Sequence, residues 1–134
     1  MLIGILALQG ACAKHAEKVR DLGYQTLFVK TQSELDACSH LIIPGGESTS
    51  FLRLLGRDRV LYDALQQYVR NRPVWGSCAG LILLADSVTS PSQNSLGVIE
   101  IAVERNGYGR QLNSFFADDI DVVDDGTRLL EQRR

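Results

Sequence analysis

The sequence predicts an α/β protein of three layers (αβα), with helices on both faces of a mainly parallel sheet. Short apolar runs alternate with helical patterns along the chain, at the spacing of βαβ units. Crossovers of this kind are right-handed, and they bury parallel strands between two layers of helices. The 134 residues are 45% hydrophobic and 22% charged, which suits a globular domain. We therefore expect residues 1–134 to form a single domain.

The first half of the chain alternates between three predicted strands and two predicted helices. The strands are expected at Leu2–Leu8, Gln25–Lys30 and His40–Ile43. The first helix spans Ala11–Leu22 and ends at a glycine, a common helix stop. The second begins at the capping box of Thr31 and Glu34. The side chains of the first helix that recur at three-residue steps are expected to face the core: Ala13, Ala16, Val19 and Leu22.

The second half continues the alternation. Helices are expected at Thr49–Leu55 and Leu61–Arg70, a fourth strand at Pro73–Ser77 and a short helix at Ala79–Ala85. After them we expect a polar loop at Ser87–Ser95, a strand at Leu96–Val103 and a further short strand at Ile120–Val123.

Charge and cysteine content exclude several classes of protein. The net charge is −2 and Lys and Arg are spread along the chain, so we expect no nucleic-acid partner and no membrane partner. No apolar run approaches the roughly 20 residues of a membrane span. The three cysteines form no CxxC pair, which predicts neither a disulfide framework nor a metal site, and we expect no cofactor. These features favour a reducing, cytoplasmic location.

The stretch Gly76-Ser77-Cys78-Ala79-Gly80 carries the strongest functional signal. It joins a predicted buried strand to a predicted helix and has the G-x-C-x-G pattern of a nucleophile elbow. Small residues on both sides permit the tight turn that lifts the Cys78 side chain above the sheet edge. The helix N-terminus favours a thiolate, and the Ala79 N–H is suited to stabilise an oxyanion. We predict that Cys78 is a nucleophile; the alternative is a buried structural cysteine.

Two further stretches should meet this nucleophile, because sites in open α/β sheets form above the carboxyl ends of the strands. Gln9–Gly10 follows the first strand and Pro44–Ser48 follows the third. Gly45 and Gly46 let the backbone approach a ligand, and an N–H of this loop would complete a two-donor oxyanion hole. Glu47, at a helix start, is suited to pair with an ammonium group. Taken alone, the stretch is equally consistent with a tight turn and a helix cap.

The remaining polar residues give weaker signals. Arg105 follows the predicted strand at Leu96–Val103 and is suited to grip a carboxylate, although a solvated surface arginine fits its spacing equally well. A cysteine nucleophile needs a base, normally a histidine. We expect His15 on the outer face of the first helix and His40 at the far end of the third strand, so neither is well placed.

Four motifs match a known family in order and spacing. They are Leu6-Ala7-Leu8-Gln9-Gly10, Pro44-Gly45-Gly46-Glu47-Ser48-Thr49, Gly76-Ser77-Cys78-Ala79-Gly80-Leu81, and Val103-Glu104-Arg105-Asn106 with Gly109-Arg110-Gln111. Over about residues 1–118, the chain resembles the glutaminase subunit of pyridoxal 5′-phosphate synthase, a class I (triad) glutamine amidotransferase. The resemblance implies a flavodoxin-like three-layer fold that lacks its C-terminal part.

The resemblance implies an enzyme that hydrolyses L-glutamine to glutamate and ammonia through a Cys78 thioester. The ammonia would pass to the barrel-shaped synthase subunit, which builds pyridoxal phosphate (vitamin B6) from sugar phosphates. The residues implied for glutamine binding are Gly46, Glu47, Ser48 and Arg105. The residues expected at the oxyanion site or at the interface with the synthase are Gln9, Gly10, Gly45 and Ala79.

The chain departs from the family in its last part. Family members continue with an Ile-Arg glutamine-binding pair and a His-Pro-Glu segment that supplies the base, whereas this chain stops at Arg134 and diverges over residues 119–134. We therefore expect impaired turnover. One alternative is a module that binds glutamine or docks on the synthase without catalysis. Another is a different triad amidotransferase, such as the glutaminase of imidazole glycerol phosphate synthase, against which the Arg105 motif argues.

Overall fold

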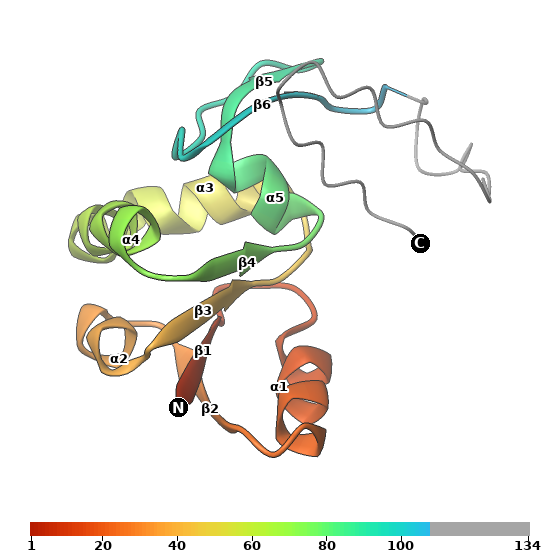
Figure 1. The fold of residues 1–134 in the computed structure, drawn as a ribbon. Coiled ribbons are helices and arrows are strands. Elements are labelled where there is room, and N and C mark those ends of the chain that lie inside the picture. The colour runs from red at the N-terminus through yellow and green to blue at the C-terminus, as the bar shows by residue number, and fades with distance from the viewer. Residues whose placement is uncertain (108–134) are drawn as a thin grey trace, which may run out of the picture.

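The computed structural model describes residues 1–107 and confirms the three-layer α/β fold (Figure 1). Four parallel strands form one sheet in the order β2-β1-β3-β4. They are β1 (Leu2–Leu6), β2 (Gln25–Val29), β3 (His40–Ile43) and β4 (Val74–Gly76). Two further strands pair in parallel as a separate ribbon, β5 (Ala85–Thr89) and β6 (Ile99–Glu104).

Helices lie on both faces of the four-stranded sheet (Figure 1). Helix α1 (Cys12–Asp21) covers one face, where Ala16 and Val19 pack with Ile5 and Ile42. Four more helices share a larger core with the other face. They are α2 (Gln32–Ala37), α3 (Ser48–Arg57), α4 (Arg59–Asn71) and α5 (Ala79–Leu84).

Strand β3 shows why its buried residues form an unbroken apolar run. Leu41 and Ile43 point into the larger core, while Ile42 between them packs on the α1 side. Successive side chains of a strand point to opposite faces, and here both faces are covered by helices. The three buried positions Leu41–Ile43 therefore all need apolar side chains.

Side chains stabilise the first turns of helices α2 and α4. The predicted capping box begins α2: Glu34 N–H donates to Thr31 Oγ1 (3.3 Å), and Thr31 N–H donates to the Glu34 carboxylate (3.0 Å). Asp58 lies between α3 and α4, and its carboxylate accepts a hydrogen bond from the N–H of Leu61 (2.9 Å). These caps satisfy N–H groups that have no partner inside the helix.

The predicted inner face of α1 is wrong at two of its four positions. Ala16 and Val19 are buried as expected, but Ala13 and Leu22 are exposed. Three residues turn an α-helix through about 300°, so a stripe at three-residue steps rotates by about 60° at each step. Its two ends therefore leave the core, and only its middle stays inside.

The predicted loop at Ser87–Ser95 is also partly wrong, because its first residues extend strand β5 to Thr89. Only every third side chain of β5 is buried, among them Val88, so the segment looks polar in the sequence. Leu96 precedes β6 rather than belonging to it, and its N–H donates to the carbonyl of Leu83 (2.7 Å). The predicted strand at Ile120–Val123 lies outside the described residues.

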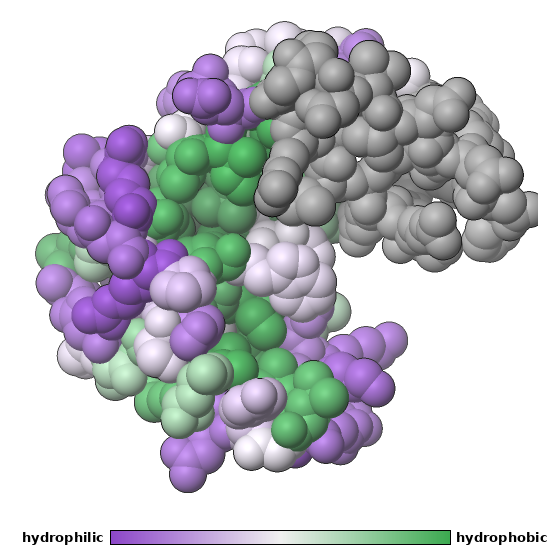
Figure 2. Space-filling model, viewed as in Figure 1, coloured by the Kyte–Doolittle hydropathy of each residue, from purple (hydrophilic) through white to green (hydrophobic). Residues whose placement is uncertain are grey.

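Figure 2 shows hydrophilic side chains over the outer side of α4 and hydrophobic ones between α4 and the β5–β6 ribbon, over helix α5. Leu81 and Ile82 of α5 are half-buried and pack against the apolar cluster of the ribbon. Within residues 1–107, none of the helices has the length and apolar character needed to cross a membrane.

Helix α5 lies directly against strand β3 because Gly80 has no side chain. A Cβ atom at Gly80 would overlap the carbonyl oxygen of Ile43 and lie 2.8 Å from its carbonyl carbon. Gly76 is equally confined, since a Cβ there would lie 2.7 Å from the carbonyl carbon of Gly80. The two glycines of the G-x-C-x-G pattern thus set the distance between the strands and the helix.

Replacing Gly80 with Ala should lower the free energy of unfolding by about 1–3 kcal/mol, because the new methyl group forces α5 away from β3. Gly56→Ala is the matched control: Gly56 is in α3 and nothing lies within 4 Å of its would-be Cβ. That substitution should raise the stability by about 0.5–1 kcal/mol. Urea denaturation of both variants measures the difference, and equal stability would contradict the packing described here.

Candidate active site

Cys78 occupies a strained turn between β4 and α5. Its backbone has φ 51° and ψ −113°, a region that residues with a side chain rarely adopt. Such strain costs about 1–3 kcal/mol and persists only where neighbouring structure enforces it. Here Ser77 N–H donates to the carbonyl of Ile43 (3.1 Å), and Gly80 N–H donates to that of Ser77 (2.9 Å). The turn has the backbone shape of a nucleophile elbow, as predicted.

The loop after β3 lies against the Cys78 side chain. A Cβ atom built on Gly45 would be 3.2 Å from Cys78 Cβ and 4.0 Å from its Sγ. Ala79, which follows Cys78 and begins α5, is fully buried. The Gly45 loop and the start of α5 thus both lie next to the Cys78 side chain.

The loop after β1 joins the same group. Gly10 has φ +89°, and a Cβ there would overlap the carbonyl oxygen of Gly45. Gln9 Nε2 donates to the carbonyl oxygen of Glu47 (2.5 Å), and Gly46 packs on the Gln9 side chain. The structure therefore brings together the three sheet-edge stretches that the sequence predicted to meet.

Glu47 caps helix α3. Its carboxylate accepts hydrogen bonds from the N–H of Thr49 (3.0 Å), the N–H of Ser50 (2.7 Å) and the hydroxyl of Ser50 (2.9 Å). These bonds, the one from the Thr49 N–H first, lower the pKa of Glu47 from an ordinary value of 4.5 to about 2. Glu47 is therefore a permanent negative charge at neutral pH beside the loop that contacts Cys78.

Arg105 lies opposite this charge. Its Nη2 is 3.5 Å from Glu47 Oε1, and its Nη1 donates to Thr49 Oγ1 (3.4 Å). The Arg105 side chain is only 17% exposed, whereas that of Glu47 is 54% exposed. A solvated surface arginine, which the sequence left open, is thus excluded. The two charges stand together although 58 residues separate them in the chain.

Gln93 is a member of this group that the sequence did not indicate. Its Oε1 accepts hydrogen bonds from Arg105 Nη1 (2.6 Å) and from the Ser48 hydroxyl (3.1 Å). Its Nε2 is buried and has no partner within the described residues, a state that costs about 1–3 kcal/mol. Gln93 stands in a stretch of serines and other turn formers, where no spacing distinguishes it from a solvated loop residue.

Neither histidine of the chain makes a hydrogen bond with Cys78 in the described residues. His15 is not on the outer face of α1 as predicted: it is half-buried, with its ring edge-on to that of Trp75 (centroids 5.5 Å apart, 86° between planes). Burial lowers the pKa of His15. His40 begins β3, and its Nδ1 is 3.0 Å from Ser39 Oγ. As expected, it lies at the amino end of the strand, away from the loop that contacts Cys78.

The other two cysteines belong to the packing rather than to the site. Cys12 Sγ donates to the carbonyl of Gln9 (3.3 Å), and Cys38 Sγ donates to that of Glu34 (3.2 Å). Burial raises the pKa of both thiols, which keeps them protonated. In the part of the chain that the structure describes, no three His, Cys, Asp or Glu side chains gather as metal ligands.

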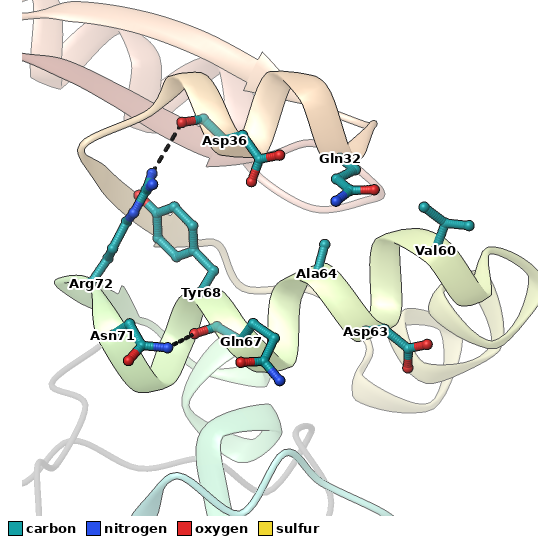
Figure 3. Close-up of a pocket in the computed structure, with 9 residues that line it drawn as sticks. All are labelled: Gln32, Asp36, Val60, Asp63, Ala64, Gln67, Tyr68, Asn71 and Arg72. Carbon is teal, nitrogen blue, oxygen red and sulfur yellow. Dashed lines mark hydrogen bonds between the residues drawn. The ribbon is translucent and has the colours of Figure 1, made fainter.

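A surface groove in the described residues lies away from the predicted site residues (Figure 3). It lies between α2 and α4, has a volume of about 520 Å³ and is lined by residues that include Val60, Ala64 and Tyr68. Arg72 closes one end, where its Nη1 donates to the carbonyl oxygens of Asp36 (3.0 Å) and Cys38 (2.8 Å). None of the site residues predicted from the sequence lines this groove.

Known proteins resemble this chain over most of its length. A model of the SNO glutamine amidotransferase family matches residues 5–128. The chain is 46% identical over 115 residues to the pyridoxal 5′-phosphate synthase subunit PdxT of Solibacter usitatus, a match that covers 86% of this chain and 59% of that protein. It is 48% identical over 120 residues to PdxT of Kosmotoga olearia, and this match covers 88% of this chain and 62% of that protein.

A solved structure is similar as well. A solved structure described as "Crystal structure of glutamine amidotransferase" superimposes on this chain with a TM-score of 0.74 and 39% sequence identity. The match covers 84% of this chain and 61% of that one. This chain therefore spans about 60% of the length of the curated relatives that it matches.

Glu47 gives a prediction about acid stability. Its pKa is lower in the folded state than in the unfolded chain, so the charged carboxylate stabilises the fold above about pH 4.5, and this contribution disappears as the pH falls toward 2. Glu47→Ala should lower the free energy of unfolding by about 1 kcal/mol at pH 7, as the loss of other caps does. Denaturation curves at pH 7, 4 and 2.5 should show the difference from wild type shrinking with pH. A constant difference would contradict the assignment of the cap to the ionised carboxylate.

Proposed function

This chain belongs to the SNO glutamine amidotransferase family, and on that premise we propose that it carries the glutamine-hydrolysing site of a pyridoxal 5′-phosphate synthase. The observation that carries the proposal is the strained backbone of Cys78, in the turn between β4 and α5 beside the Gly45 loop. A nucleophile elbow presents its side chain to a substrate, whereas a structural cysteine has no need of such strain.

The chemistry is an acyl transfer through sulfur. The Cys78 thiolate attacks the side-chain amide carbon of L-glutamine, a C–S bond forms, and the C–N bond breaks as the nitrogen takes a proton and leaves as ammonia. Water then cleaves the γ-glutamyl thioester to give glutamate and restore the thiol. The backbone around Gly45 and Ala79 would stabilise the negative oxygen of each tetrahedral intermediate. Gln9 and Gly10 would hold the Gly45–Glu47 loop in place through their contacts with it.

The charged pair next to the elbow suits the other end of the substrate. An amino acid carries one ammonium and one carboxylate group, and Glu47 and Arg105 offer one charge of each sign, 3.5 Å apart. Gly46 and Ser48 flank Glu47 in the chain. In our proposal these four residues hold glutamine so that its amide reaches the thiol.

The partner follows from the family. The relatives are named as subunits of pyridoxal 5′-phosphate synthase, which supports a synthase subunit that receives the ammonia. Three free thiols in the described residues support a reducing compartment, such as the cytoplasm. We also treat the chain as one domain, because its main core unites the sheet with helices α2 to α5.

A second candidate is a module that binds glutamine without turnover. It is favoured by the positions of the two histidines, since His15 packs on Trp75 and His40 lies at the opposite end of its strand. Thiol attack without a base is slower by orders of magnitude. Both candidates use the same glutamine site and differ only in ammonia release.

Covalent labelling tests the shared site. A chloroketone analogue of L-glutamine should alkylate Cys78, which displaces chloride, and L-glutamine should protect the thiol whereas D-glutamine should not. Intact-mass spectrometry should find one adduct on wild type and on the control Cys12→Ala, and none on Cys78→Ala. Labelling that is insensitive to L-glutamine would overturn the proposal.

Ammonia release separates the two candidates. The chain is mixed with a pyridoxal 5′-phosphate synthase subunit and L-glutamine, and ammonia and glutamate are measured, with Cys78→Ala as the control. Equal amounts of both products, lost in Cys78→Ala, indicate a glutaminase. Protection by L-glutamine without ammonia indicates the binding module.

A further inference from the structure

A hydrogen-bonded group formed by Ser48, Gln93 and Arg105 joins three distant parts of the chain. Ser48 begins α3, Gln93 belongs to the connection between β5 and β6, and Arg105 directly follows β6. Gln93 Oε1 accepts from both of the others, at 3.1 Å and 2.6 Å. The backbone of Arg105 is tied to the end of β5, because its N–H donates to the carbonyl of Thr89 (2.9 Å).

The orientation of the Gln93 amide follows from its neighbours. A guanidinium group can only donate hydrogen bonds, so the amide atom that faces Arg105 must be the oxygen. The nitrogen is then turned into the protein, where it is buried without a partner among residues 1–107. An orphaned buried donor is rare in folded proteins and calls for an explanation. Here the amide is oriented so that its oxygen accepts from Arg105 and Ser48, and this orientation leaves its nitrogen without an acceptor in the described residues.

Because Gln93 is uncharged, its hydrogen bond leaves the positive charge of Arg105 in place. Arg105 has one carboxylate within salt-bridge distance in the described residues, Glu47, and the oxygens of Glu47 already accept three hydrogen bonds from Thr49 and Ser50. An amide oxygen fixes the guanidinium without neutralising it, whereas a second carboxylate would compete with any anionic ligand. The group therefore holds a positioned cation that keeps its charge available.

We propose that Gln93 is a positioning residue for substrate binding: through its single oxygen it holds Arg105 and the Ser48 hydroxyl in the arrangement that receives the carboxylate end of an amino-acid substrate. The inference rests on the proposed function, since it deepens the description of the same glutamine site. Gln93 acts through Arg105 and Ser48 and makes no hydrogen bond with Cys78 in the described residues, so it affects binding and leaves the chemical step at Cys78 unchanged.

The test separates binding from chemistry by measuring the rate of Cys78 alkylation against the concentration of the chloroketone analogue of L-glutamine. The half-saturating concentration reports binding and the limiting rate reports chemistry. Gln93→Leu should raise the half-saturating concentration at least tenfold and change the limiting rate less than twofold. Asn94→Leu, which places the same side chain on the exposed neighbour, should match wild type in both. Alkylation of Cys78 by iodoacetamide, which has no amino-acid end, should be unchanged in both variants.

Gln93→Glu distinguishes positioning from a structural role. It keeps the oxygen for Arg105 and Ser48, so the thermal unfolding midpoint should be at least that of wild type, but its charge should still raise the half-saturating concentration several-fold. A merely structural role predicts wild-type binding for this variant and a lowered midpoint for Gln93→Leu. If Gln93→Leu does not fold, Gln93→Glu carries the test alone.

The outcomes are distinct. Saturable labelling of wild type together with unchanged binding in the variants overturns the role of Gln93 and leaves the proposed function standing. Slower iodoacetamide alkylation in Gln93→Leu also overturns it, because it reveals general damage to the elbow. Labelling of wild type that neither saturates nor responds to L-glutamine overturns the proposed function and this inference together.

Discussion

The contact between Gly80 and the carbonyl oxygen of Ile43 is the constraint on which the site depends. It lets α5 approach β3 without an intervening side chain, and this close approach forces the chain to reverse at Cys78. The same strand leads into the Gly45 loop, which therefore lies against the thiol. The strained backbone of Cys78 is stable because hydrogen bonds from the N–H groups of Ser77 and Gly80 hold the residues on both sides of it in place.

Glu47 shows how one side chain serves both the fold and the site. As the cap of α3 it satisfies backbone N–H groups, and these bonds hold the carboxylate in its charged form. The same bonds orient it toward Arg105, so the first turn of α3 positions the negative half of the charged pair. The positive half comes from a different part of the chain and relies on Gln93 for its position.

The sequence predicts most of the strands and helices because their signals are local. Capping at Thr31, the glycine after α1 and continuous apolar runs each depend on residues a few positions apart. The predictions are wrong where the hydrophobic pattern of a helix or strand is incomplete. Ala13 and Leu22 belong to a stripe whose period is too short for a helix. Strand β5 lies in a polar stretch of sequence, because only some of its side chains contact the core.

The sequence by itself determines the strained turn at Cys78, the glycine-rich loops and the family, because the spacing of small residues around Cys78 reflects a backbone geometry that few sequences permit. Only the tertiary structure decides which distant groups act together. The pairing of Glu47 with Arg105, the packing of His15 on Trp75 and the place of Gln93 depend on how the β5–β6 ribbon and α1 fold back on the sheet. Contacts between residues so far apart in the chain leave no periodic trace in a single sequence, because no local backbone preference encodes them.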